Sequence, residues 1–195
     1  MDKSNYVIWG IKKVKHAVVL DRLLDVPKQY EFRKGVSRIQ GWPEAAKYTQ
    51  DMDFPDNTIL VDSLMNIDFR IIASARLKRF LESWQLQKVE YLPLTILDHK
   101  GRVRADDYFF VHPIEPIDCL KIDDCGVKWD LISTDSIFSL ERLAVEEGKI
   151  DSDRQLFRLK HFYRVTLIGR DLAYAIDREG FTGIRWIEFD NYPET

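Results

Sequence analysis

Residues 74–86 read SARLKRFLESWQL, and this stretch predicts an amphipathic helix. Its large apolar residues recur at the spacing i, i+3, i+4 and i+7, which places them on one stripe of a helix. They are Leu77, Phe80, Leu81 and Trp84. The hydroxyl of Ser74 can accept a hydrogen bond from the free backbone N–H groups of the first turn, so Ser74 is the expected N-cap.

A hairpin is predicted directly after this helix. Val89–Leu97 is rich in β-forming residues, residues 98–101 (DHKG) form a turn, and Asp107–His112 is the second strand. Pro93 removes a backbone donor from the first strand. We therefore expect that strand to lie at a sheet edge or to contain a bulge.

The rest of the chain supplies shorter elements. The further strand candidates are Tyr6–Trp9, His16–Leu20, Thr58–Val61, Ile117–Ile122, Val127–Ile132, Ile137–Val145, Leu156–Leu159 and Gly183–Phe189. A second helix is expected over Arg170–Arg178, with Gly180 in the left-handed position that ends many helices. Residues 1–55 are irregular, and loops that wrap the core are expected there.

These elements predict one α+β domain over residues 1–195, with a mostly antiparallel sheet and a few flanking helices at about 74–86 and 170–178. The 45% hydrophobic and 31% charged content is typical of a globular protein. Aromatic residues are numerous, and a surplus beyond the core can serve an interface.

Composition also restricts the partners and the location. The net charge of −3 argues against broad nucleic-acid binding, which depends on Lys and Arg neutralising phosphates. The apolar runs are too short to span a bilayer, and no secretory signal is visible at the N-terminus. Two cysteines do not form a disulfide framework, so we expect a protein of the cytoplasm with no membrane partner.

The motifs of common enzyme classes do not occur. The nine glycines are scattered singly, so neither a phosphate loop nor a dinucleotide-binding pattern is present. Cys119 and Cys125 are poorly spaced for zinc, even with His99 and His112 upstream. Cys119 with His161 or His112 as base lacks a local signature. No catalytic residue, cofactor or metal is therefore expected.

Six carboxylates gather in one part of the sequence. They are Asp106, Asp107, Glu115, Asp118, Asp123 and Asp124. These carboxylates have three interpretations: solvated loops, a protein-binding patch, or a pair for general acid–base catalysis. Because acidic residues dominate from 106 to 124 and basic ones from 70 to 104, patches of opposite charge could steer a partner.

Several segments resemble a known family in their order and spacing. They are Ile72–Leu81, Val89–Leu94, Asp107–Val111, Ile117–Cys119, Leu156–Leu159 and Gly180–Trp186. Over about residues 55–190 these segments resemble the DUF1629 family, also described as Imm11 or MXAN-0049-type immunity proteins of bacterial polymorphic toxin systems. The chain departs from the family at Ile168-Gly169-Arg170, where Ser or Thr is the more usual cap of the last helix.

The resemblance implies a bacterial cytoplasmic protein that binds and neutralises a cognate toxin, and it supplies no catalytic residues. If that toxin acts on nucleic acid, its active site is expected to be basic. An acidic surface formed by Asp106, Asp107, Asp123 and Asp124 would then be the contact site. Two alternatives stay open. One is an enzyme of unfamiliar type, such as a hydrolase that uses Asp106, Asp107, Asp118, Asp123 and Asp124; the other is a self-assembling structural module.

Overall fold

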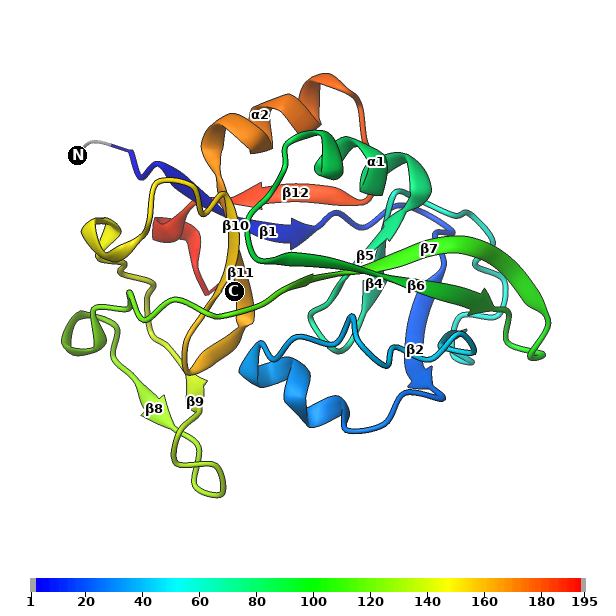
Figure 1. Cartoon of the computed structure of the whole chain (residues 1–195), viewed down its shortest axis with the longest axis horizontal. Coiled ribbons are helices and arrows are strands. Elements are labelled where there is room, and N and C mark those ends of the chain that lie inside the picture. Colours follow the sequence, from blue (N-terminus) through cyan, green and yellow to red (C-terminus); the bar gives the residue numbers. More distant parts are fainter. Residues whose placement is uncertain (1–2, 194–195) are drawn as a thin grey trace.

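The computed structural model describes residues 3–193, which form a single, mostly β domain (Figure 1). Six strands close a barrel, four form an antiparallel sheet, and two form a small separate arm. The barrel strands are β2 (Val19–Leu24), β3 (Lys47–Gln50), β4 (Ser63–Asn66), β5 (Ile71–Ser74), β6 (Val89–Leu97) and β7 (Val103–Pro113). The sheet strands are β1 (Tyr6–Ile11), β10 (Leu156–Leu159), β11 (Phe162–Gly169) and β12 (Ile184–Ile187), and the arm consists of β8 (Lys128–Trp129) and β9 (Ile137–Ser139).

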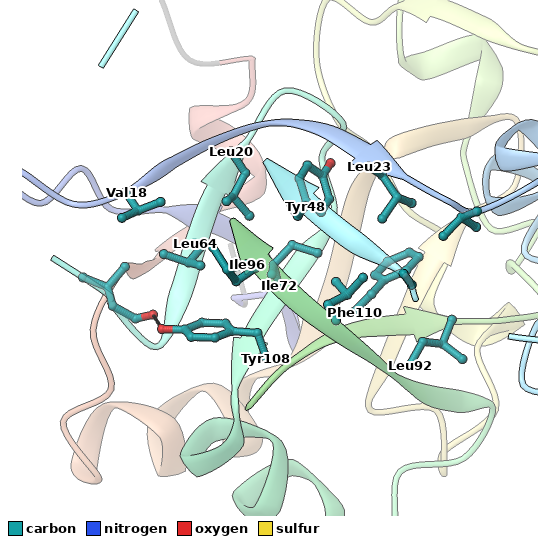
Figure 2. Close-up of a cluster of buried hydrophobic side chains, with 14 of the residues drawn as sticks. Val18, Leu20, Leu23, Tyr48, Leu64, Ile72, Leu92, Ile96, Tyr108 and Phe110 are labelled. Carbon is teal, nitrogen blue, oxygen red and sulfur yellow. Dashed lines mark hydrogen bonds between the residues drawn. The ribbon is translucent and has the colours of Figure 1, made fainter. Parts of the chain in front are cut away.

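The barrel runs in the order β2-β3-β6-β7-β5-β4. Its β2–β4 and β3–β6 pairs are parallel, and its other pairs are antiparallel. Closure leaves no unpaired edge that would invite pairing with another chain. Figure 2 shows that the interior is filled by side chains from all six strands, with the Tyr108 hydroxyl donating to the Val61 carbonyl at 2.8 Å. The barrel is therefore a packed core and not a channel.

The four-stranded sheet runs β10-β11-β1-β12 and lies beside the barrel. Helices α1 (Ala75–Ser83) and α2 (Arg170–Arg178) cover it on one side (Figure 1). Leu77 and Leu81 of α1 share a buried cluster with Leu172 and Ile176 of α2 and with strand residues of both sheets. This shared cluster joins the sheet to the barrel as one unit.

Both predicted helices are confirmed. Ser74 caps α1 by accepting from the Leu77 N–H at 3.2 Å. The helix ends at Ser83, earlier than expected, and Trp84 lies beyond its last turn with a partly exposed ring. Helix α2 has the expected bounds, and Gly180 and Gly183 both have positive φ in the turn that leads to β12.

The predicted hairpin is the longest paired element of the fold. Its second strand starts earlier than expected, at Val103. The expected bulge is confirmed, because the register shifts between Leu94 and Ile96. Strand β3 pairs with β6 only over Thr95–Leu97, so Pro93 needs no ladder donor on that side. The Pro93 carbonyl accepts instead from the Trp42 indole N–H at 2.8 Å.

The first third of the chain is more regular than the sequence predicts. The strand predicted at Tyr6–Trp9 is confirmed as β1, and the one predicted at His16–Leu20 overlaps β2 only at Val19 and Leu20; β3 and β4 form where loops that wrap the core were expected. These strands are short, and two of their pairings are parallel, so neither hairpin spacing nor clean alternation marks them. Thr58–Val61, expected as a strand, contributes only a single bridge at Ile59.

One other expectation is wrong, and one strand was missed. Ile117–Ile122 forms isolated bridges at Ile117 and Leu120, followed by a 3-10 turn at Ile122–Asp124, and no regular strand. Strand β11 was not predicted from the sequence, although it lies between β10 and β1 and pairs with both. No helix among residues 3–193 is long and apolar enough to cross a membrane.

Candidate functional site

The acidic residues singled out from the sequence do not form one patch. Asp106 and Asp107 stand opposite Thr95 at the bulge of the β6–β7 hairpin, which ends at the right of Figure 1. Asp123 and Asp124 lie in the segment between β7 and β8, which loops at the left. The structure therefore separates the two pairs along the long axis of the molecule.

The remaining carboxylates of that group are held by lysines. Glu115 lies 2.7 Å from the Lys88 ammonium, and Asp118 lies 3.0 Å from that of Lys160. No group of three or more metal-ligating side chains occurs within residues 3–193. The six carboxylates singled out from the sequence thus do not converge on one site.

The cysteines and histidines of the described chain do not form a pair of nucleophile and base either. Cys119 is fully buried, and burial raises the pKa of its thiol to about 12, so it is protonated and inert at neutral pH. His161 faces Asp135 in the β8–β9 arm, at 2.9 Å from the carboxylate to Nδ1. His112 lies elsewhere, at one end of the barrel.

That end of the barrel carries an unusual concentration of buried arginine. A 3-10 turn, η1 (Gln29–Lys34), covers it, and the buried ring of Phe32 packs edge-on against Phe110 at 5.2 Å. The guanidinium groups of Arg38 and Arg70 lie over the Phe32 ring, at 5.5 Å and 5.1 Å from its centroid. Cation–π contacts of this kind stabilise a charge that has lost its water.

Two of these arginines are neutralised by acids. Arg38 pairs with Glu31 at 2.5 Å, and its backbone N–H donates to the buried Glu90 carboxylate at 2.8 Å. Arg70 pairs with Asp68 at 2.9 Å. Both pairs satisfy the rule that a buried charge needs a counter-charge and hydrogen bonds.

Arg158 breaks that rule. It lies in β10 with only 3% of its surface exposed, yet no carboxylate within residues 3–193 is paired with it. Nη1 donates to the Phe32 carbonyl at 3.2 Å and Nη2 to the Phe69 carbonyl at 3.4 Å, while Nε is buried without a partner. Burial and the neighbouring charge of Arg70 lower its pKa to about 10, which leaves it protonated at neutral pH.

His112 reports the same positive environment. Burial comes first, and Arg158, Arg70 and Arg38 add to it, so that the pKa of the imidazole falls to about 3. The ring is therefore neutral at physiological pH. Its Nε2 donates to the Val36 carbonyl at 3.0 Å, which helps to hold the segment after η1 against the barrel.

A cavity of about 390 Å³ opens beside Arg158, and we call it the arginine pocket. Its walls come from η1, the β4–β5 turn, β10 and β11. The charged residues that line it are Arg33, Arg70, Arg158, Arg164 and Asp68. Four arginines thus face a single aspartate, which is already paired with Arg70.

The mouth of this pocket is rich in exposed aromatic residues. Tyr30 of η1 is 60% exposed and Phe69 of the β4–β5 turn 51%; Phe138 of β9, 56% exposed, lies beside them with its ring 5.8 Å from the Arg164 guanidinium. A second cavity of about 610 Å³, next to the β8–β9 arm, shares Tyr30, Arg33, Tyr163 and Arg164 with the first. Figure 1 shows η1 at the bottom of the view, between the barrel and the lower end of β10 and β11.

We name the residues around these two cavities the aromatic–arginine surface. It consists of Tyr30, Arg33, Phe69, Phe138, Tyr163 and Arg164. Its arginines stack on its rings: Arg33 lies 4.8 Å from the Tyr163 centroid, and Arg164 lies 5.6 Å from that of Phe69. Tyr, Phe and Arg are the residues that protein–protein interfaces favour.

Phe69 is held in a strained backbone conformation. Its φ is +55°, a left-handed value that a bulky side chain rarely adopts. The buried Asn66 side chain fixes the turn by accepting from the N–H groups of Asp68 and Arg70, both at 3.1 Å. Strain of this kind is maintained at sites where a side chain must be presented in a set direction.

Comparison with known proteins identifies the family. A model of the Imm11 immunity protein family matches residues 8–191, nearly the whole chain. The chain belongs to this family. The comparison with curated proteins gave no match.

Membership confirms the resemblance and extends it beyond residues 55–190, so the first strands belong to the Imm11 unit as well. An Imm11 protein neutralises a cognate toxin, and the family is one of immunity proteins and not of enzymes. The unfamiliar hydrolase is therefore not supported. The family match assigns no contact residues.

The arginine pocket of this Imm11 protein was not predicted from the sequence, because its arginines come from four separate segments. One local signal was present. Arg158 stands between Phe157 and Leu159 in a strand whose four residues are all buried. An arginine inside such an apolar run needs a special partner, and this is the clue that the sequence offered.

Proposed function

We propose that this chain neutralises its toxin in the bacterial cytoplasm by binding the toxin domain directly, through the aromatic–arginine surface. The observation that carries the proposal is a set of three exposed rings, Tyr30, Phe69 and Phe138, beside two arginines: Arg164 lies over Phe69 and Phe138, and Arg33 lies over Tyr163. Such residues lose little side-chain entropy on binding and dominate the energy of many interfaces.

The shape of the region supports the same proposal. Two adjoining cavities give the surface relief into which side chains of a partner can insert. The tip of the β8–β9 arm extends it with Leu131 and Ile132, both 97% exposed. Large apolar side chains that are fully exposed beside a cavity are typical of binding surfaces.

The acidic pairs stay proposed as a second contact site. Asp123 and Asp124 are the better placed of the two, because their segment leads into β8 and so into the arm beside the surface. Asp106 and Asp107 lie on the opposite side of the molecule and would need a separate part of the toxin. Charge complementarity of this kind affects the rate of association more than the affinity.

Co-expression with the toxin domain encoded by the neighbouring gene tests the proposal. We expect the chain to restore growth and to co-purify with the toxin in a fixed ratio. The double variant Tyr30→Ala/Phe138→Ala should lose both properties, whereas Tyr174→Ala, an equally exposed tyrosine on α2, should keep them. Rescue by the double variant at wild-type level would assign toxin binding to another surface. The same assay on Asp123→Asn/Asp124→Asn and Asp106→Asn/Asp107→Asn tests the acidic pairs.

The solution mass of the chain alone tests the remaining alternative, a self-assembling structural module. A monomer is consistent with a surface that is free for the toxin. A discrete homo-oligomer whose formation requires Tyr30 and Phe138 would favour the self-assembling module instead.

A further inference from the structure

The arginine pocket contains a charge that the protein itself leaves unbalanced. Arg158 is buried and protonated, and it has no carboxylate partner in the part of the chain that the structure describes. An isolated buried charge is costly, and an opposite charge that reaches it is therefore stabilised. The neighbouring arginines increase the positive potential instead of relieving it.

The hydrogen bonds of Arg158 also leave its guanidinium incompletely satisfied. A guanidinium carries five N–H donors, and Arg158 uses two of them on main-chain carbonyls, at 3.2 Å and 3.4 Å. Its Nε–H is buried and has no acceptor among the described residues. An unsatisfied donor in a native structure calls for an explanation, and a ligand that arrives from solvent is one.

The second arginine of the pocket floor is already committed. Arg70 pairs with Asp68 and lies over the rings of Phe32, Tyr48 and Phe110, which fix its position. Tyr48 donates to the same Asp68 carboxylate at 2.5 Å. The aspartate is thus shared between two donors and is not available to Arg158.

The rim supplies two further cations. Arg33 and Arg164 line the pocket from η1 and β11, and neither forms an ion pair with a carboxylate among residues 3–193; both lie on aromatic rings. Stacking of this kind keeps a guanidinium in place while its N–H edges stay free for an acceptor. A buried donor at the base and two exposed donors at the rim suit a group with several oxygens.

We propose that the arginine pocket is a binding site for an oxyanion, a phosphoryl or carboxylate group, held between Arg158 at its base and Arg33 and Arg164 at its rim. Guanidinium groups bind such groups through paired, charge-assisted hydrogen bonds. The oxyanion has two potential sources: a free small anion, or an acidic side chain of a bound toxin.

The test uses the isolated chain and two probes, inorganic phosphate and acetate, at constant ionic strength set with sodium chloride. We expect calorimetry to give saturable binding of at least one probe and thermal unfolding to shift upward with its concentration. Arg158→Met, which keeps the length of the side chain, should weaken binding about tenfold, the value of one charge-assisted hydrogen bond. Arg33→Gln, at an exposed position that does not challenge folding, should weaken it severalfold.

Arg79→Gln on the exposed face of α1 is the matched control, and its affinity should equal that of the wild type. No saturable binding of either probe, or equal affinity in all variants, would overturn the proposal. Competition then identifies the source. If the bound probe displaces the toxin, the toxin supplies the oxyanion; if probe and toxin bind together, the site serves a free anion.

Discussion

Nη1 of Arg158 in β10 donates to the main-chain carbonyl of Phe32 in η1 at 3.2 Å, across 126 residues of sequence. This bond joins the four-stranded sheet to the turn that covers the end of the barrel. It also positions the guanidinium at the base of the arginine pocket. One side chain therefore links the fold to the surface that we propose as the binding site.

The backbone strain at Phe69 makes a first prediction. Phe69→Gly relieves the positive φ, so the free energy of unfolding should not fall and should rise by up to about 1 kcal/mol. Toxin affinity should fall about tenfold, because the exposed ring is lost. Urea unfolding and calorimetric titration measure the two quantities.

Gln85→Gly is the control for Phe69→Gly. Gln85 also has a positive φ, +50°, but lies at the end of α1 away from the surface. It should gain similar stability with unchanged affinity. A parallel loss of stability and affinity at Phe69 would show that the ring is structural.

The pKa of His112 predicts how stability depends on pH. The folded pKa of about 3 lies below the ordinary value of about 6.5, so the unfolded chain takes up a proton that the folded chain excludes. The stability is fully present above pH 6.5 and is lost as the pH falls. Between pH 7 and pH 5 the free energy of unfolding should decrease by about 2 kcal/mol.

Variants at two histidines separate this contribution from others. His112→Phe should flatten the dependence between pH 5 and pH 7, although its stability at pH 7 falls because the Val36 carbonyl loses its donor. His16→Asn, at an exposed histidine, should retain the wild-type slope. An unchanged slope in His112→Phe would contradict the assignment.

Gly183 tests the contact between the sheet and the barrel. A Cβ at this position would lie 2.3 Å from the Ser63 carbonyl oxygen, and φ is +82°. Gly183→Ala should therefore cost about 1 kcal/mol for the backbone and a further 1–3 kcal/mol for the clash. Gly101→Ala has a similar φ of +78° but open space around it, and should show the backbone cost alone. Equal losses in urea unfolding would mean that the strands separate easily at this point.

The cap of α1 gives a local test. Ser74→Ala removes the acceptor for the Leu77 N–H and the donor to the Asp62 carboxylate at 2.8 Å, and should lower the free energy of unfolding by about 1–2 kcal/mol. Ser83→Ala, at the exposed end of the same helix, should change it by less than about 0.5 kcal/mol. The same chemical change at the two ends of α1 thus separates capping from helix propensity, and a loss at Ser83 as large as that at Ser74 would argue against the cap.

The sequence predicts an element correctly where its pattern lies within a few neighbouring residues. The stripe of α1, the turn of the β6–β7 hairpin and Gly180 after α2 each depend on a few neighbouring residues, and all are confirmed. Of the early strands, β1 was predicted and β2 only in part, whereas β3 and β4 were missed because their partners are distant: β2 pairs with β4 in parallel, and β3 with β6. Nothing within these short segments encodes such pairings.

The candidate site, like the early barrel strands, depends on residues that are distant in sequence. Its residues come from η1, the β4–β5 turn, β9, β10 and β11, and no sequence window contains more than a few of them. The acidic pairs could be recognised in the sequence because the two residues of each pair are adjacent. Adjacent charges in sequence did not become one patch in space, since the chain carries them to opposite sides of the molecule.

The central claim is that this Imm11 protein binds its toxin through the aromatic–arginine surface. Its most direct test is a calorimetric titration of the purified toxin domain with wild type, Tyr30→Ala and Tyr174→Ala. We predict one toxin per chain, an affinity at least tenfold weaker for Tyr30→Ala, and an unchanged affinity for Tyr174→Ala. Equal affinities for all three proteins would contradict the claim.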